Sequence, residues 1–285
     1  MSATKSRVAV VQMVSTADIH ANLEMASTLT AQAVEQGAQL VLLPENFAVL
    51  DGGPLSDFAE RQGDPGALLQ KFASNLAARH RIYLAAGTVP LNTRPADDSR
   101  PGELEPTDGR VRSASLLYGP EGSLLARYDK IHLFDVEVDD KQANYSESLS
   151  FEPGEQLVAV DTALGRIGMS VCYDLRFPEL YRSLLAMQAE LLLVPSAFTQ
   201  VTGKAHWEVL LRARAIENQC YVIAANQGGV HNATRETYGH SMIVDPWGEI
   251  LARVEEGPGV AVADIDLDRM VGLRQRMPVI SHRRL

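Results

Sequence analysis

The sequence contains two copies of one succession of segments, and this internal repeat constrains the fold more than any other feature. Three segments of the first half have similar segments, in the same order, in the second half: 7–11 (RVAVV) with 166–170 (RIGMS), 39–47 (QLVLLPENF) with 190–198 (ELLLVPSAF), and 117–127 (LYGPEGSLLAR) with 243–253 (IVDPWGEILAR). Both halves alternate short apolar runs, typical of buried strands, with amphipathic runs at helical spacing. The repeat therefore predicts two similar strand-and-helix units.

Apolar strands flanked by amphipathic helices predict sheets whose faces are covered by helices, which is an α/β fold. Two such units can stack sheet on sheet with their helices outside. We therefore predict a four-layer α-β-β-α sandwich in a single domain, residues 1–285. A doubly wound single sheet is the alternative, but the sequence lacks G-x-G-x-x-G and P-loop motifs, the usual phosphate signatures of that class.

Local signals predict where helices and loops lie. Asp18 is suited to cap a first helix, and Asp64, followed by a proline, is typical of the start of a second helix with apolar residues every four positions from Leu68. In the second half, we expect helices over 177–187 and 203–218. Two polar stretches are predicted to be surface loops: the proline-rich residues 91–112, which leave and re-enter the same domain, and residues 135–156.

The acidic composition argues against several kinds of partner. With 26 Lys and Arg against 36 Asp and Glu, the formal net charge is −10, whereas nucleic acids and anionic membrane surfaces attract basic proteins. No apolar run approaches the roughly 18 residues of a membrane span, and the first residues show no signal-peptide pattern, so we expect a cytoplasmic protein. The two cysteines lack zinc-ligand spacing and predict neither a disulfide framework nor a metal site.

Cys172 ends a strand-like run, and Pro178 is suited to the first turn of a following helix. Cys172 would then lie on a strand-to-helix turn, where helix N-terminal amides and Arg176 favour a reactive thiolate. The alternative is a core cysteine at a strand end. Asp174 is predicted to be a helix N-cap rather than a catalyst, and Cys220, beside an apolar run, is predicted to be buried and inert.

Three charged residues are candidates for catalysis beside this cysteine. Glu45 follows an apolar run at the rim of a predicted sheet and could act as a general base. Lys130, in an aromatic-flanked segment, could stabilise an oxyanion, and Glu147 could orient that lysine. Taken singly, each could also be an ordinary solvated residue.

Residues on the predicted helices could bind a substrate or only stabilise the fold. Arg176 could bind a carboxylate through its planar guanidinium, or form an ion pair with Glu179 or Asp174. His206 could line a pocket, whereas its neighbour Trp207 is predicted to be core. Charged residues farther along the same run are expected to form packing salt bridges: Arg212, Arg214 and Glu217.

Taken together, three motifs in this order resemble the nitrilase (carbon–nitrogen hydrolase) superfamily: 43–46 (LPEN), 128–134 (YDKIHLF) and 168–179 (GMSVCYDLRFPE). The resemblance runs from about Val8 to Ile265. It implies a catalytic triad of Glu45, Lys130 and Cys172, with Glu147 as a second glutamate and the backbone N–H of Tyr173 as an oxyanion donor. It also implies that no metal or organic cofactor is needed, and that the chain forms a homodimer or larger homo-oligomer, for which residues 266–285 are a plausible interface arm.

The finer resemblance is to the branch that contains the deaminated glutathione amidases, through five segments: 132–137, 195–199, 202–217, 238–248 and 278–284. It implies an amidase that hydrolyses deaminated glutathione to 2-oxoglutarate and cysteinylglycine through a cysteine thioester. This small-molecule substrate carries two carboxylates. We expect Arg176 to bind the keto-acid carboxylate, with Thr199 and His206 as further pocket candidates, and Lys130 and Arg176 to make the pocket locally positive.

Other functions fit the same scaffold. An omega-amidase acting on 2-oxoglutaramate would share the triad and release ammonia, and a carbamoyl hydrolase or true nitrilase would share the fold. A non-catalytic binding protein is disfavoured because Glu45, Lys130, Glu147 and Cys172 are all present. A papain-like protease is disfavoured because no histidine occupies a recognisable motif for pairing with the cysteine.

Overall fold

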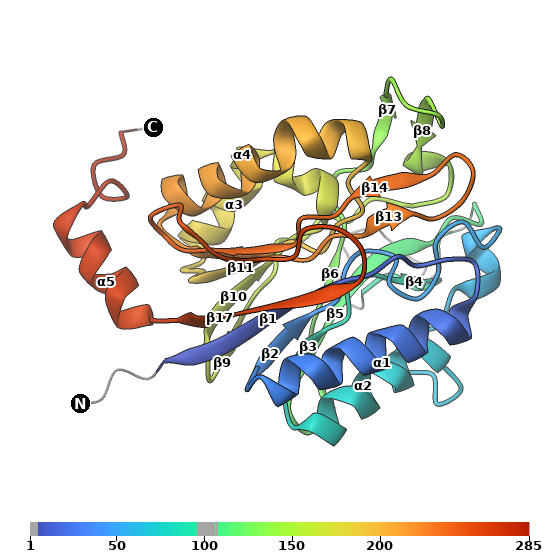
Figure 1. Cartoon of the computed structure of the whole chain (residues 1–285), viewed down its shortest axis with the longest axis horizontal. Coiled ribbons are helices and arrows are strands. Elements are labelled where there is room, and N and C mark those ends of the chain that lie inside the picture. The colour runs from blue at the N-terminus through green and yellow to red at the C-terminus, as the bar shows by residue number, and fades with distance from the viewer. Residues whose placement is uncertain (1–4, 96–105, 107, 285) are drawn as a thin grey trace.

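The computed structural model describes residues 5–95, 106 and 108–284, and two sheets form its centre (Figure 1). The first, seven-stranded sheet has the order β17-β1-β2-β3-β5-β4, with β6 also paired to β5. Its strands are β1 (Ser6–Gln12), β2 (Leu40–Leu42), β3 (Tyr83–Ala85), β4 (Val89–Leu91), β5 (Arg112–Tyr118), β6 (Leu124–Asp129) and β17 (Gly259–Ile265).

The second, six-stranded sheet has the order β16-β15-β12-β11-β10-β9. Its strands are β9 (Ala159–Thr162), β10 (Gly165–Met169), β11 (Leu191–Leu193), β12 (Tyr221–Ala224), β15 (Met242–Val244) and β16 (Ile250–Arg253). Strands β1, β2 and β3 are parallel and are followed by the antiparallel hairpin β5-β6. Strands β10, β11 and β12 are likewise parallel and are followed by the antiparallel hairpin β15-β16. The internal repeat of the sequence is therefore a repeat of sheet topology.

Helices cover the outer faces of both sheets (Figure 1). Helices α1 (Ile19–Glu35) and α2 (Leu68–His80) cover the first sheet, and α3 (Pro178–Ala186) and α4 (Gln200–Asn218) cover the second. Alternate residues of β1 show the layering, because Val8 and Val10 pack in one apolar cluster with residues of the second sheet, whereas Ala9 and Val11 pack with α1 and α2. The four-layer α-β-β-α sandwich is confirmed.

Helix α2 begins later than its sequence predicts. Asp64 and the proline after it belong to a turn, in which the N–H of Ala67 donates to the Asp64 carbonyl at 3.0 Å. The carboxylate of Glu60 accepts hydrogen bonds from the N–H groups of Leu69 and Gln70 and so caps the helix from outside. Leu68 is 47% exposed and lies outside the apolar face, whereas Phe72 and Leu76 pack in the core as predicted. The cap of α1 is confirmed, because Asp18 accepts from the N–H of Ala21 at 3.1 Å.

Two small hairpins extend from one end of the sandwich (Figure 1). The first, β7 (Asp135–Glu137) and β8 (Asn144–Ser146), lies inside 135–156, which was expected to be an irregular loop. The second, β13 (Gly228–Val230) and β14 (Glu236–Tyr238), had no sequence signal. Of the expected loop 91–112, residue 91 belongs to β4 and residue 112 to β5, and residues 96–105 and 107 lie outside the described residues.

The chain ends in helix α5 (Leu267–Arg276), which lies beyond the ends of β1 and β17 at the side of the sandwich (Figure 1). It is attached through buried Met270 and through Arg274, which donates to the Gln219 carbonyl at 3.1 Å. None of the described helices has the length and apolar character needed to cross a membrane.

Candidate active site

One pocket at the ends of the strands brings most of the predicted site residues together. Glu45 follows β2, Lys130 directly follows β6, and Cys172 lies on the turn after β10, so the two sheets both contribute. Glu147 begins a 3₁₀ turn, η2 (Glu147–Leu149), after the β7-β8 hairpin. Seven predicted residues line the pocket, namely Glu45, Lys130, Glu147, Cys172, Tyr173, Arg176 and Thr199.

Lys130 lies between the two carboxylates. Its Nζ is 2.8 Å from Oε1 of Glu45 and 2.7 Å from Oε1 of Glu147, and only 1% of its side chain is exposed. The other oxygen of Glu147 accepts from the N–H of Phe134 at 2.6 Å. Burial lowers the pKa of Lys130, but the charges of Glu147 and Glu45 oppose this effect, and that pKa is held well above its usual range. Lys130 is therefore a fixed ammonium ion.

Backbone packing fixes the position of Glu45. Gly87, at a φ of 31°, lies so close to the chain before Glu45 that a Cβ atom would be 1.9 Å from the carbonyl oxygen of Pro44. From the second half of the chain, Gln227 donates to the Glu45 carbonyl at 3.0 Å and to Ser15 at 2.8 Å. The general-base candidate is thus held by both halves of the protein.

Cys172 occupies a sharp turn. Its φ of 49° is in the left-handed region, and its N–H donates to the Pro195 carbonyl at 2.9 Å. Burial raises the pKa of the Cys172 thiol well above its usual range, the negative charge of Glu45 raises it further, and Lys130 opposes both only in part. These directions run against the expected thiolate, because burial opposes the charged form more than the positive groups favour it. The resting residue is a thiol that needs a base.

Asp174 is not the N-cap of the following helix, because α3 begins after Phe177. It is instead fully buried inside the 3₁₀ turn η3 (Cys172–Arg176), where it accepts four hydrogen bonds. The donors are the Tyr128 hydroxyl at 2.6 Å, the Val171 N–H at 2.9 Å, the His132 N–H at 3.0 Å and His132 Nδ1 at 2.7 Å. One carboxylate therefore joins the turn that carries the nucleophile to the segment that carries Lys130.

Helix α4 holds the same turn from the other side. Arg214 forms the expected ion pair with Glu217 at 3.0 Å, and it also donates to the Leu175 carbonyl at 3.1 and 2.7 Å. Arg212 pairs with Glu208 at 3.4 Å, and Trp207 is fully buried, both as predicted. Arg214 is thus a positioning residue for the turn as well as a packing residue.

Arg176 reaches the pocket without a carboxylate partner. Its guanidinium lies 5.7 Å from the ring centre of Tyr173 and 5.3 Å from that of Phe198, and its Nη1 is 3.2 Å from Nδ1 of His206. Within residues 5–95, 106 and 108–284 it forms no ion pair, so the alternative pairing with Glu179 or Asp174 is wrong. Arg176 therefore presents an uncompensated positive charge to the pocket.

The remaining candidates divide between the pocket and its surroundings. His206 is exposed outside the pocket and contacts Arg176 instead of lining the site, which corrects its expected position. Thr199 lines the pocket and caps α4, accepting from the N–H of Thr202 at 3.2 Å. In the described part of the chain, nothing accepts a hydrogen bond from the N–H of Tyr173. Cys220 is fully buried away from the site, and burial raises its pKa to about 11.

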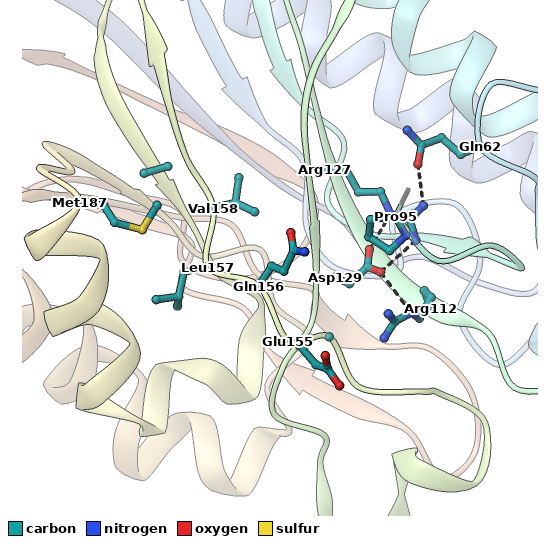
Figure 2. Close-up of a pocket in the computed structure, with 12 residues that line it drawn as sticks. Gln62, Pro95, Arg112, Arg127, Asp129, Glu155, Gln156, Leu157, Val158 and Met187 are labelled. Carbon is teal, nitrogen blue, oxygen red and sulfur yellow. Dashed lines mark hydrogen bonds and ion pairs between the residues drawn. The ribbon is translucent and has the colours of Figure 1, made fainter. Parts of the chain in front are cut away.

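A second pocket lies beside the strand that leads to Lys130, and none of the predicted site residues lines it (Figure 2). Figure 2 shows Arg127 directed at Gln62 and Asp129, with Arg112 on the other side of the same carboxylate. The carboxylate of Asp129 is 2.7 Å from Nε of Arg127 and 3.2 Å from Nε of buried Arg112. These ion pairs fix the residue that precedes Lys130.

Six residues that line the pocket were not among the predicted site residues: Asn46, Phe134, Ala197, Phe198, Thr202 and Arg235. Two of them, Asn46 and Arg235, are strongly polar and bear on the chemistry. Asn46 has a left-handed φ of 56°, and its N–H donates to the Thr88 hydroxyl at 2.9 Å. Its place directly after Glu45 was the available signal. Arg235 lies between β13 and β14, in a polar stretch without any motif that pointed to a site.

Comparisons with known proteins show the family of this chain. The family model described as carbon-nitrogen hydrolase matches residues 7–275. A deaminated glutathione amidase of Synechocystis sp. is 45% identical over 277 residues, covering 96% of this chain and 97% of that protein. That of Homo sapiens is 43% identical over 278 residues, covering 97% and 82%. The solved structure of the C. elegans NitFhit protein is similar with a TM-score of 0.85 and 40% identity, and the match covers 100% of this chain and 66% of that one. The chain belongs to the carbon–nitrogen hydrolase family of the nitrilase superfamily.

Proposed function

We propose that this amidase hydrolyses the amide bond of deaminated glutathione to 2-oxoglutarate and cysteinylglycine. The observation that carries the proposal is the array of Glu45, Lys130 and Glu147, joined at 2.8 and 2.7 Å, in one pocket with Cys172. The relatives that bear the name of this activity are similar along nearly the whole chain.

The first half-reaction forms a thioester. Because burial and the charge of Glu45 raise the pKa of the Cys172 thiol, Glu45 takes its proton as the sulfur attacks the amide carbonyl carbon. The negative charge that develops on the carbonyl oxygen is stabilised by the Lys130 ammonium and by the N–H of Tyr173. The C–N bond then breaks, and the proton held by Glu45 goes to the departing amine.

The second half-reaction uses the same residues with water as the nucleophile. Glu45 takes a proton from a water molecule as the water oxygen attacks the thioester carbonyl carbon. Lys130 and the N–H of Tyr173 again stabilise the oxyanion. The C–S bond breaks, the proton returns to the sulfur of Cys172, and the carboxylic acid is released. Glu147 keeps Lys130 charged and in place through both steps.

The charges in the pocket suit an anionic acyl group. Lys130 is already compensated by two carboxylates, so it adds little attraction for a negatively charged substrate. Arg176, which has no such partner, supplies that attraction and binds the keto-acid carboxylate.

The test compares kcat/KM of the protein for deaminated glutathione and for 2-oxoglutaramate, with Cys172→Ala as the inactive control. We expect the first substrate to be preferred and the acyl-enzyme thioester to add the mass of the keto-acid group to Cys172. A preference of about tenfold or more for 2-oxoglutaramate would instead identify an omega-amidase, and no turnover of either would contradict an amidase of this specificity.

We further propose that the protein is a homodimer or larger homo-oligomer in which residues 266–285 form an interface arm. The support is that α5 and the residue after it leave two apolar side chains about half exposed, Val271 and Met277. Light scattering at the mass of a single chain would contradict this.

A further inference from the structure

The catalytic pocket continues into a neighbouring groove. Asn46, Phe134, Glu147 and Arg235 line both the pocket and the groove. The groove then runs between the loop that follows Asn46 and the β7-β8 hairpin, where Tyr145 lies. A substrate held at Cys172 therefore has room to extend past the two glutamates.

Arg235 is an unsatisfied cation in the wall of this groove. Its guanidinium lies 4.9 Å from the ring centre of Tyr145, and its Nη1 donates to the amide oxygen of Gln142 at 3.3 Å. Its Nε is buried and has no hydrogen-bond partner, and no carboxylate in the described part of the chain pairs with it. A buried N–H without an acceptor is costly, and a guanidinium is best satisfied by a planar anion such as a carboxylate.

A chain of three aromatic rings connects the two uncompensated arginines. Arg176 lies 5.7 Å from Tyr173, and the ring of Phe134 follows at 5.1 Å. The ring of Tyr145 lies a further 5.1 Å from Phe134, and Arg235 lies 4.9 Å beyond it. The two guanidinium groups contact different rings, and of the two only Arg235 also lines the groove. They are therefore placed for two different carboxylates rather than for one.

The neighbours of each arginine indicate which side of the amide it faces. Arg176 belongs to the turn of the nucleophile, next to Phe198 and Thr199, where the acyl group attached to Cys172 would remain. The groove begins instead at Asn46 and Glu147, beside Glu45, which protonates the departing amine. The departing group therefore extends toward Arg235.

We propose that the groove is a leaving-group subsite and that Arg235 binds a carboxylate carried by the amine that is released. This rests on the proposed function and goes beyond it, because it makes Arg235 the residue that selects amides of a carboxylate-bearing amine over simple amides that release ammonia. A released amine that carries a carboxylate would occupy the groove, whereas ammonia would leave the groove empty.

Three substrates test this with the full-length protein: deaminated glutathione, the same molecule with its glycine carboxylate converted to a carboxamide, and 2-oxoglutaramate. Arg235→Ala should lower kcat/KM for deaminated glutathione about 10- to 100-fold, mainly through KM. It should change kcat/KM for the other two substrates by less than about threefold. Arg235→Lys should recover part of the loss, and Arg253→Ala, at an exposed arginine paired with Glu255, is the control.

The carboxamide substrate separates loss of carboxylate binding from a general loss of folding or activity in the variant. Wild-type protein should prefer the acid to the carboxamide by about the factor that Arg235→Ala loses, and Arg235→Ala should no longer distinguish the two. Equal losses on all three substrates, or no loss on any, would overturn the inference while the amidase assignment stands. Failure of the wild-type protein to cleave deaminated glutathione would overturn the proposed substrate itself.

Discussion

Replacing Asp174 by asparagine tests whether one buried carboxylate holds the turn that carries the nucleophile. The substitution keeps the shape of the side chain and exchanges one oxygen for an NH2 group. One oxygen of Asp174 accepts from the N–H of His132 at 3.0 Å, and the other accepts from the N–H of Val171 at 2.9 Å. Whichever oxygen is exchanged, one backbone N–H in the interior loses its acceptor.

The cost follows from this geometry. An orphaned buried N–H costs about 1–3 kcal/mol, and the bonds that remain lose the negative charge that makes such bonds roughly twice as strong. We therefore expect Asp174→Asn to lower the free energy of unfolding by about 2–5 kcal/mol, and the thermal midpoint by about 5 °C or more. Because a loosened turn misplaces Cys172, kcat should fall about tenfold or more.

Thermal unfolding and steady-state kinetics, measured on the same preparations, check both numbers. The matched control is Asp264→Asn, which removes the exposed ion pair between Asp264 and Arg7 at 2.7 Å and should leave the thermal midpoint nearly unchanged. Equal midpoint shifts for the two variants, or wild-type kcat in Asp174→Asn, would refute the view that this carboxylate positions the nucleophile.

Three further predictions concern the site and the core. Gly87→Ala would place a Cβ atom 1.9 Å from the Pro44 carbonyl, so kcat should fall about tenfold or more; Gly63→Ala, at a positive φ with open space around it, is the control, and equal effects would contradict this. Glu147→Gln removes one charge beside Lys130 and should lower kcat about 10- to 100-fold with little change in KM; an unchanged kcat would count against a positioning role. Burial raises the pKa of Cys220 to about 11, so the contribution of the thiol to stability is complete below the unfolded thiol pKa near 8.5 and is lost as pH rises toward 11. The thermal midpoint should therefore fall more steeply between pH 8 and pH 10.5 for wild type than for Cys220→Ala. Parallel curves of midpoint against pH would exclude this contribution.

The architecture could be predicted because periodicity and topology are linked. Each apolar run of the repeat is too short for a helix and too apolar for an exposed strand, so it had to lie inside a covered sheet. The start of α2 could not be found in the same way. Its cap is the side chain of Glu60, which reaches Leu69 and Gln70 from outside the helix. Because the capping residue lies nine and ten positions before the two N–H groups that it binds at the helix N-terminus, the residues around the helix start carry no capping motif.

The site was predictable to the extent that its residues follow strands. Glu45 and Cys172 follow β2 and β10, and strand ends of parallel sheets are where side chains can converge. The pKa of Cys172 was not predictable, because burial decides it and burial depends on how tightly the two halves pack. Arg235 was missed for a related reason, since only the folded β13-β14 hairpin brings it to the pocket.

The internal repeat also shows which residues depart from it. At the offset that relates the two strand-and-proline segments, Glu45 corresponds to Ser196, and at the offset of the first strands, Cys172 corresponds to Met13. Ser196 and Met13 are fully buried and extend the pairing between strands, through isolated bridges to Asn226 and Gln227. Each of these two strand ends therefore occurs twice in the chain. In each case one copy has a catalytic candidate and the other copy has a residue with a structural role only. Because the base stands on the first sheet and the nucleophile on the second, neither unit alone contains a working site. Packing of the two halves is therefore a requirement of the chemistry as well as of the fold.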